Sequence, residues 1–222
     1  MYFYNYRIED LCIYKLLELC NMAKIITIAH QKGGVGKSTI ALNLALCFQD
    51  QLRVALVDSD LQGSLYHARE DFPDLTILTA EKVSDIKEMD YDLIIIDTPP
   101  YLSNRLTDFF LLSDFVLVPT KAGFFDVMAI RSTLALIRFA QAKKPTLKAG
   151  IALNMIKHRS GVTKDVSELL KNMGTPLLKT MVHDRVSITR SAITAGILSG
   201  TDQKAKEEFT SLAEEVVEYI SA

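Results

Sequence analysis

The residues best suited to chemistry form a glycine-rich loop between an apolar run and a helix-like stretch. The loop consists of Gln31, Lys32, Gly33, Gly34, Val35, Gly36, Lys37, Ser38 and Thr39. Glycines let the backbone curl so that successive N–H groups point at phosphate oxygens, and the following helix adds its positive N-terminal dipole. In such a loop Lys37 reaches the β- and γ-phosphates, and the Ser38 hydroxyl is a ligand of Mg²⁺. The loop therefore predicts a site for a nucleoside triphosphate with its magnesium ion.

Carboxylates follow two other apolar runs. Asp58 and Asp60 end the first run, and their i, i+2 spacing puts both side chains on one side of an extended segment, facing the mouth of the loop. Asp97 closes the second run, Leu93–Asp97, where a carboxylate at a strand end holds Mg²⁺ through water. Taken alone, such residues are often solvated loop carboxylates. Three motifs in order, at three successive strand ends, favour a single nucleotide site.

The elements that must position these residues alternate between strands and helices. Strands are predicted at Lys24–Ala29, Val54–Asp58, Leu93–Asp97, Phe115–Pro119, Ala149–Leu153 and Pro176–Lys179. Helices are predicted at Lys37–Phe48, Asn104–Leu112, Asp126–Ala142, Val166–Met173 and Gln203–Ile220. Continuous Val/Ile/Leu runs are typical of strands buried on both faces. The pattern predicts an α/β fold, a mostly parallel twisted sheet with helices on both faces, in which ligands bind at the carboxyl ends of the strands.

The composition narrows the class of protein. The chain has 222 residues, of which 49% are hydrophobic and 23% charged, which is normal for one large globular domain. No apolar run is long enough for a transmembrane helix. Three cysteines at no zinc-like spacing argue against a disulfide framework or a zinc site, so a cytoplasmic location is expected. The formal charge of −2 gives no global positive field, so any contact with nucleic acid needs a local basic patch.

The first 21 residues differ from the rest, because they hold four of the eight tyrosines and two of the three cysteines. We interpret 1–21 as an N-terminal extension and 22–222 as a single domain. The extension is either a short docking helix or sequence translated ahead of a start at Met22, and the second interpretation is favoured. It is too short for a helix-turn-helix domain, so operator-specific repression is not expected.

The loop departs from the common G-x-x-x-x-G-K-[ST] pattern, because Gln31 holds the first glycine position and a second lysine, Lys32, opens the loop. In this it resembles the deviant Walker A loop of the ParA/MinD superfamily of P-loop ATPases. The resemblance implies a P-loop NTPase fold, with ATP sandwiched between two subunits of a homodimer. It also implies that Lys32 crosses the dimer interface to the partner's nucleotide and is catalytic together with Lys37.

Further motifs extend this resemblance. Residues 58–63 resemble the family's switch I, with Leu61 in place of the usual proline. The resemblance implies that Asp60 orients the attacking water and that Asp58 supports the Mg²⁺ network. The segment from 153 to 159 resembles the part of the family that lies near the adenine, which places Asn154 beside the base. An asparagine that caps a turn is the alternative.

Among the branches of this family, the small ParA-type form without a helix-turn-helix domain fits best. The last helix is rich in glutamate, which disfavours an anionic membrane surface. No cysteine follows Cys47 to hold an iron–sulfur cluster. The ParA resemblance implies weak Mg²⁺-dependent ATP hydrolysis that is stimulated by DNA and by a cargo-bound adaptor, either ParB-like or another small centromere-binding protein.

The same resemblance implies non-specific binding of double-stranded DNA through the basic C-terminal third, with Arg190 as the contact and Arg185 nearby. Such binding needs only the neutralisation of phosphates. The sequence therefore predicts a nucleoid-associated ATPase that segregates a plasmid or chromosome. Ordinary solvated cations are the alternative for the arginines. For the function, the alternatives are a ParA-like ATPase that positions a protein cargo and an ATP-binding scaffold with negligible turnover.

Overall fold

A computed structural model describes residues 8, 13, 23–60, 64–79, 83–101, 105–157 and 162–221. The strands are β1 (Lys24–Ile28), β2 (Val54–Asp58), β3 (Thr76–Thr79), β4 (Leu93–Asp97), β5 (Phe115–Thr120), β6 (Lys148–Ile156) and β7 (Leu177–His183). The α-helices are α2 (Lys37–Phe48), α3 (Ser64–His67), α4 (Arg105–Leu112), α5 (Phe124–Lys143), α6 (Val162–Lys171), α7 (Val186–Arg190) and α8 (Gln203–Ser221). Short 3-10 helices are η1 (Arg69–Asp71), η2 (Val83–Glu88) and η3 (Ser191–Ile193).

The strands form one parallel sheet in the order β3-β2-β4-β1-β5-β6-β7. The predicted α/β fold is therefore confirmed. The central strands β2, β4 and β5 are buried along their whole length, as their continuous apolar runs predict. Since the chain leaves β1 toward one side of the sheet and later returns to its other side at β5, the carboxyl end of β1 is the switch point where ligands bind in such sheets.

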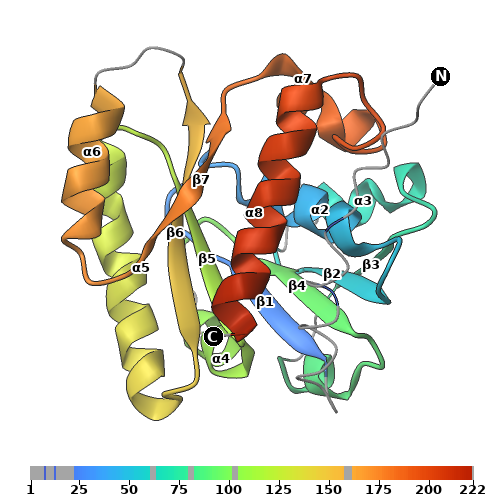
Figure 1. Ribbon diagram of the computed structural model, residues 1–222. Helices are drawn as coiled ribbons and strands as arrows, with labels where there is room; N and C mark the ends of the chain where they lie inside the picture. Colours follow the sequence, from blue (N-terminus) through green and yellow to red (C-terminus); the bar gives the residue numbers. More distant parts are fainter. Residues whose placement is uncertain are drawn as a thin grey trace.

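Helices cover both faces of the sheet (Figure 1). Helices α2 and α8 pack on one face, where they contact each other, and α4, α5 and α6 pack on the other. Helix α2 is apolar nearly all round because it lies between the sheet and α8. No helix among the described residues is long and apolar enough to cross a membrane.

The structure differs from the predicted elements mainly at edges and ends. Strand β3 was not predicted, because its sequence Thr-Ile-Leu-Thr is short and only partly buried at the edge of the sheet. Strands β6 and β7 are longer than predicted, and α5 and α6 begin earlier, at Phe124 and Val162. Residue 104 of one predicted helix lies outside the described residues. The ends of helices and strands are the part of an element that a hydrophobic pattern predicts least well.

Two glutamates of α8 face the sheet instead of the solvent. The Glu215 carboxylate accepts hydrogen bonds from the backbone N–H groups of Lys179 (2.7 Å) and Thr180 (2.9 Å) on the edge strand β7. The Glu208 carboxylate accepts one from the backbone N–H of His183 at 2.9 Å. The sequence analysis treats the glutamates of the last helix as surface charges. In the structure, two of them accept hydrogen bonds from the backbone of an edge strand.

Two residues of the N-terminal segment belong to the core. Ile8 and Ile13 are buried in the same apolar cluster as α2 and α8. The backbone carbonyl of Ile8 accepts a hydrogen bond from the Gln51 side chain. All the other residues of the predicted 1–21 extension lie outside the described residues.

Candidate nucleotide-binding site

The three sequence motifs meet at one edge of the sheet. In the strand register Ile28 of β1 lies beside Asp97 of β4, and Asp97 lies beside Asp58 of β2. The loop that follows β1 therefore starts at the level where both aspartates end their strands. Because carboxyl ends of parallel strands share one edge, the predicted grouping of the loop with the two aspartates is what the fold produces.

The backbone of the loop has the conformation that its glycines permit. Gly34 and Gly36 have φ values of 69° and 88°, in the left-handed region that favours glycine. A β-carbon on Gly36 would collide with the amide of Asn154, which donates a hydrogen bond to the Val35 carbonyl at 2.8 Å. The buried Asn154 side chain thus holds the phosphate loop by a hydrogen bond to its backbone. This is the turn-capping role that the sequence analysis gave as the alternative. Its predicted place beside the adenine stays a prediction.

Lys37 is a buried cation at the start of α2. Only 6% of the residue is exposed, and its ammonium donates one long hydrogen bond, 3.4 Å, to the Lys32 carbonyl. Burial lowers the pKa of Lys37, while the charges of Asp97 and Asp60 raise it. A buried ammonium with weak partners beside a curled glycine backbone is suited to a dense anion such as a terminal phosphate.

The residues that would hold Mg²⁺ fit that ion. Asp97 is 2% exposed, its Oδ1 has no hydrogen-bond partner, and the Ser38 side chain is hydrogen-bonded to the same carboxyl. Burial, together with Asp58 and Asp60, raises the pKa of Asp97 to about 7. A divalent cation held through water would reverse this, because its charge stabilises the carboxylate and its water would donate to the orphaned oxygen. Ser38 and Asp97 are therefore suited to bind Mg²⁺.

Asp58 and Asp60 differ in what they contact. The buried Asp58 carboxylate accepts backbone N–H groups of Asp60 (3.1 Å), Leu65 (2.9 Å) and Tyr66 (3.0 Å). It therefore fixes the chain on both sides of residues 61–63, which lie outside the described residues. Asp60 is half-buried, and its charge acts on the pKa values of both Lys37 and Asp97. Asp58 is placed to support the site and Asp60 to face it.

Lys32 is held within its own chain, which the sequence analysis did not anticipate. Its ammonium lies 2.5 Å from Oδ1 of Asp126 in the first turn of α5, with 41% of the lysine side chain exposed. Its backbone N–H donates to Nδ1 of His30 at 2.8 Å, and that of Gln31 donates to the Thr133 hydroxyl at 3.3 Å. Helix α5 thus holds the first residues of the phosphate loop in place.

His30 is a further residue of the site that sequence reasoning missed. It is 1% exposed and ends the segment between β1 and the loop. Burial, and then the nearby charge of Lys37, lowers the pKa of His30 to about 4, so the ring stays neutral and its Nδ1 can accept the Lys32 N–H. The only indication in the sequence that His30 belongs to the site is its position directly before the phosphate loop. A single histidine at that position matches no known motif.

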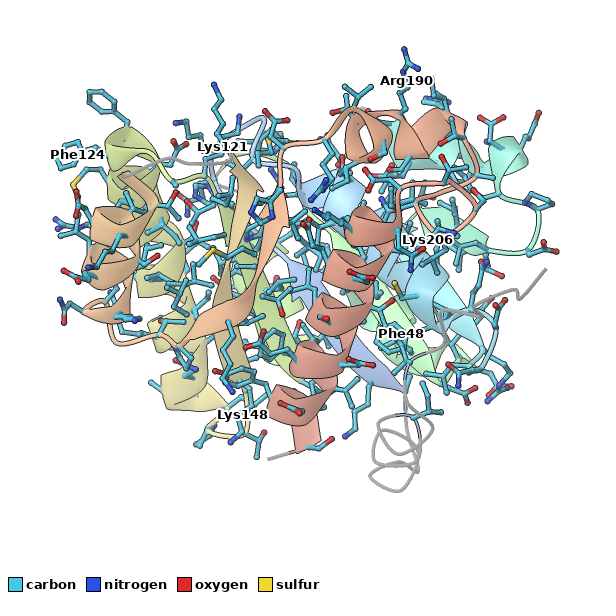
Figure 2. All side chains as sticks on the ribbon, turned by 45° about the horizontal axis from the view of Figure 1, so that its top comes forward. Phe48, Lys121, Phe124, Lys148, Arg190 and Lys206 are labelled. Atoms are coloured by element: carbon cyan, nitrogen blue, oxygen red, sulfur yellow. The ribbon has the colours of Figure 1, made fainter. Side chains whose placement is uncertain are left out.

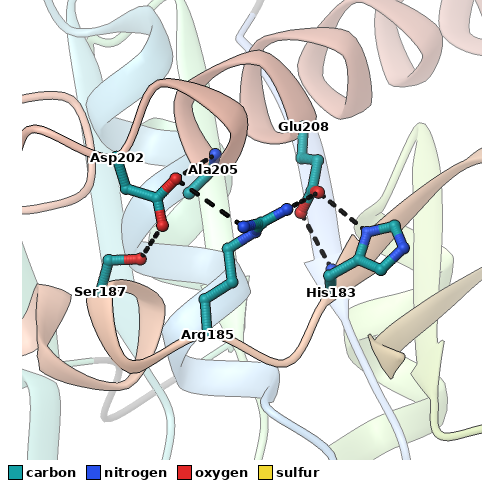
Figure 3. A network of polar contacts seen from close by, with 6 residues as sticks. All are labelled: His183, Arg185, Ser187, Asp202, Ala205 and Glu208. Atoms are coloured by element: carbon teal, nitrogen blue, oxygen red, sulfur yellow. Dashed lines mark hydrogen bonds and ion pairs between the residues drawn. The ribbon is translucent and has the colours of Figure 1, made fainter. Parts of the chain in front are cut away.

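The two arginines predicted to contact DNA lie in different environments. Arg185 is only 15% exposed and donates to Glu208 at 2.9 Å, with Asp202 on its other side at 3.9 Å (Figure 3). Glu208 also pairs with His183, and Asp202 accepts hydrogen bonds from Ser187 and the Ala205 backbone. Arg190, at the end of α7, is exposed and points outward at the rim of the molecule (Figure 2). It makes no ion pair with any residue that the structure describes.

The lysines that precede the two arginines in the basic C-terminal third do not lie on one face. Lys148 begins β6, while Lys157 follows the end of that nine-residue strand. A strand rises about 3.3 Å per residue, so these two lysines lie roughly 30 Å apart, at opposite edges of the sheet. Figure 2 shows Lys148 at the end of the molecule opposite to Arg190. The basic C-terminal third of the sequence therefore does not form a single basic surface, and the cations near Arg190 are a smaller set at the carboxyl edge.

Comparison with known proteins decides the family. Residues 26–195 match the family model described as the CobQ/CobB/MinD/ParA nucleotide binding domain. The chain belongs to this family. The ParA/MinD resemblance inferred from Lys32 and the phosphate loop is therefore confirmed, and with it the P-loop NTPase fold.

Several ParA/MinD relatives match along most of their length. Maintenance of carboxysome distribution protein A of Halothiobacillus neapolitanus is 29% identical over 212 residues, which cover 89% of this chain and 98% of the relative. The chromosome-partitioning ATPase Soj of Thermus thermophilus is 27% identical over 208 residues, 75% of this chain and 83% of the relative. A plasmid partition protein of Borrelia burgdorferi, solved with AMPPNP, matches with a TM-score of 0.69 at 24% identity, over 88% of this chain and 99% of that one.

Proposed function

We propose that this chain is a ParA-type positioning ATPase that hydrolyses ATP with Mg²⁺ and binds DNA without sequence preference as an ATP-bound dimer. The observation that carries the proposal is the pair of lysines at one phosphate loop. Lys37 is buried against the site, whereas the Lys32 side chain is substantially exposed beside it. A second lysine with a substantially exposed side chain has the reach to serve a nucleotide bound in another copy of the chain.

The residues of one copy divide the work of ATP binding and hydrolysis. The backbone N–H groups of Gly33 to Thr39 and the Lys37 ammonium bind the phosphates, and Ser38 and Asp97 hold Mg²⁺. When bound, Mg²⁺ neutralises charge on the phosphate oxygens. Asp60 orients the attacking water, supported by the Asp58 carboxylate that fixes its backbone. Lys32 leaves Asp126 and stabilises the charge that develops on the partner's phosphates, as an arginine finger does.

DNA binding is assigned to the rim that carries Arg190. Closing of the dimer brings two such rims together, and hydrolysis separates them, so binding follows the nucleotide state. Arg185 belongs to this surface by position. Because its guanidinium is already paired with Glu208, we assign it the role of holding α7 on α8, which positions Arg190.

The cargo is the part on which the relatives differ. One relative is named for carboxysome distribution and another for chromosome partitioning. The first match covers 98% of that relative, so a protein assembly is at least as well supported as a plasmid or chromosome. In either case we propose that a small adaptor on the cargo stimulates hydrolysis and that the ATPase occupies the nucleoid.

The mechanism is tested on purified protein with two variants. Lys32→Ala should bind ATP but lose dimerisation and hydrolysis, while Asp60→Ala should dimerise, bind DNA and fail to release it. Light scattering with ATP and Mg²⁺ measures the dimer, phosphate release measures turnover, and retention on immobilised duplex measures DNA binding. Normal hydrolysis by Lys32→Ala would show that this lysine does not act in the partner's site. Deleting the gene in its host then separates the cargoes: plasmid loss in one case, misplaced protein foci in the other.

A further inference from the structure

Two adjacent phenylalanines are exposed at the start of α5. Phe124 is 59% exposed and Phe125 is 79% exposed. Their rings form an edge-to-face pair with centroids 5.8 Å apart and an interplanar angle of 77°. Figure 2 shows Phe124 standing out at the upper left of the molecule, on the same upper rim as Arg190 but away from it. Single exposed apolar residues are common, but a paired aromatic patch of this kind marks a contact surface.

The next residue ties this aromatic pair to the nucleotide site. Asp126 follows Phe125 directly and holds the Lys32 ammonium. The Asp126 carboxylate lies against Gly123, where a β-carbon would collide with it, so the turn that carries the two rings is built closely around that carboxylate. One turn of α5 therefore presents both the exposed rings and the group that restrains Lys32.

We propose that Phe124 and Phe125 form an apolar contact with a second copy of this chain, made when the ATP-bound dimer closes. The inference rests on the proposed function and adds the residues that bury surface in that dimer. For Lys32 to reach the partner's phosphates, the partner must cover the surface around Lys32 and Asp126. Phe124 and Phe125 directly precede Asp126 in the first turn of α5, so they lie next to the contact that Lys32 must make.

The size of the patch is suited to this role. At about 200 Å² per ring, the exposed parts of the two rings come to roughly 300 Å² in one copy. A twofold interface uses the same patch on both copies, which gives roughly 600 Å², more than a third of a standard interface of about 1,600 Å². The rest would come from the polar surface around the phosphate loop. The pair is large enough to matter for the dimer and too small to hold it without nucleotide.

Closing of the dimer and release of Lys32 then become linked. When the two rings are covered, the partner holds the first turn of α5 in place of Lys32. The Asp126 carboxylate loses the lysine, while the lysine gains phosphate oxygens of higher charge. The monomer, with Lys32 on Asp126, has an incomplete site because the second lysine of each site comes from the other copy.

The test uses the full chain with AMPPNP and Mg²⁺, which prevents hydrolysis from reopening the dimer. Replacing both rings (Phe124→Ser with Phe125→Ser) should leave nucleotide affinity unchanged and weaken the dimer about 30-fold or more, the loss typical of central aromatic contacts. The matched control is Phe139→Ser, because Phe139 is 52% exposed and lies farther along the same helix, near its end. Sedimentation velocity measures the dimer, and nucleotide titration shows that each variant is folded.

A spectroscopic measurement provides a second readout, since the chain contains no tryptophan. In Phe125→Trp the indole should shift to shorter wavelength with AMPPNP and Mg²⁺, and the shift should depend on protein concentration. If the wild-type chain stays monomeric, the proposed function fails. If the wild type dimerises and the double serine variant dimerises equally well, this inference alone is overturned. Loss of stimulation by an adaptor without loss of the dimer would also overturn it and assign the rings to the adaptor.

Discussion

The phosphate loop and the surface of α7 both present cations at the carboxyl edge of the sheet, but in opposite ways. Lys37 is 6% exposed, surrounded by a curled backbone and two carboxylates, whereas Arg190 is exposed and has no acidic partner among the described residues. A buried cation discriminates strongly between anions, because only an anion that fits its surroundings offsets the free-energy cost of desolvation. An exposed cation accepts any polyanion that can approach it. In the proposed function, the same kind of charge thus serves one small ligand in one region and DNA of any sequence in the other.

The largest effect is expected at the buried cation. Lys37→Ala should weaken binding of ATP with Mg²⁺ about 100-fold, because the phosphates lose a desolvated charge-assisted contact. Lys148→Ala, at the opposite edge of the sheet, is the matched control and should bind as wild type. Calorimetric titration measures both. If the two variants bind ATP with equal affinity, the buried Lys37 contributes no more to nucleotide binding than the exposed Lys148.

A smaller, salt-sensitive effect is expected at the exposed cation. Arg190→Glu should weaken binding to a random duplex about tenfold at low salt and make binding less dependent on salt, since each phosphate contact contributes roughly one unit of slope. Dimerisation with ATP should not change. Lys148→Glu makes the same charge reversal at the far edge. Retention of both variants on duplex as strongly as wild type would exclude Arg190 from the DNA contact.

Arg185 provides an intermediate case, because it is a cation of the α7 region that is already paired. Arg185→Ala should lower the free energy of unfolding by about 1–3 kcal/mol, since Glu208 and Asp202 lose a partner that is 15% exposed. Urea unfolding measures the loss. If stability is unchanged while DNA binding falls as far as in Arg190→Glu, then Arg185 contacts DNA directly and the positioning role is wrong.

The effect expected at His30 appears only as a pH dependence of stability. Its folded pKa of about 4 lies below the ordinary value of 6.5, so the unfolded chain takes up a proton first as the pH falls. Its contribution to stability is complete above pH 6.5 and is lost as the pH falls toward 4. His30→Asn keeps an acceptor for the Lys32 N–H and removes the titration, so the loss between pH 7.5 and pH 5 should shrink by about 1–2 kcal/mol. An unchanged slope would contradict the buried, neutral ring.

The sequence was sufficient for the centre of the molecule and insufficient for contacts between distant segments. Glycines around Lys37 and apolar runs that end in Asp58 and Asp97 determine local conformation, and parallel pairing then brings the ends together. The contact of Lys32 with Asp126 joins residues 94 positions apart and has no local pattern. The strand β3 was missed for a related reason, because a four-residue edge strand has too few buried positions to show a period.

The same limit applies to charge. The basic composition of the C-terminal third could not reveal that a nine-residue strand separates Lys148 from Lys157. Nor could it reveal that Arg185 is paired, while Arg190 has no ion pair among the described residues. Fractions of exposure and ion pairs depend on which helix packs against which strand. That information arises only with the tertiary structure, so the proposed DNA-binding surface was the least predictable part of the candidate site.

The glutamates of α8 have a consequence for how this molecule can associate. An edge strand with free backbone N–H groups is a template on which another sheet can add a strand. Glu215 and Glu208 already accept the N–H groups of Lys179, Thr180 and His183, so at these positions β7 offers no donors to an incoming chain. Addition of a strand from another sheet is thereby blocked along this part of β7, which leaves the rim of the phosphate loop for the association that we propose.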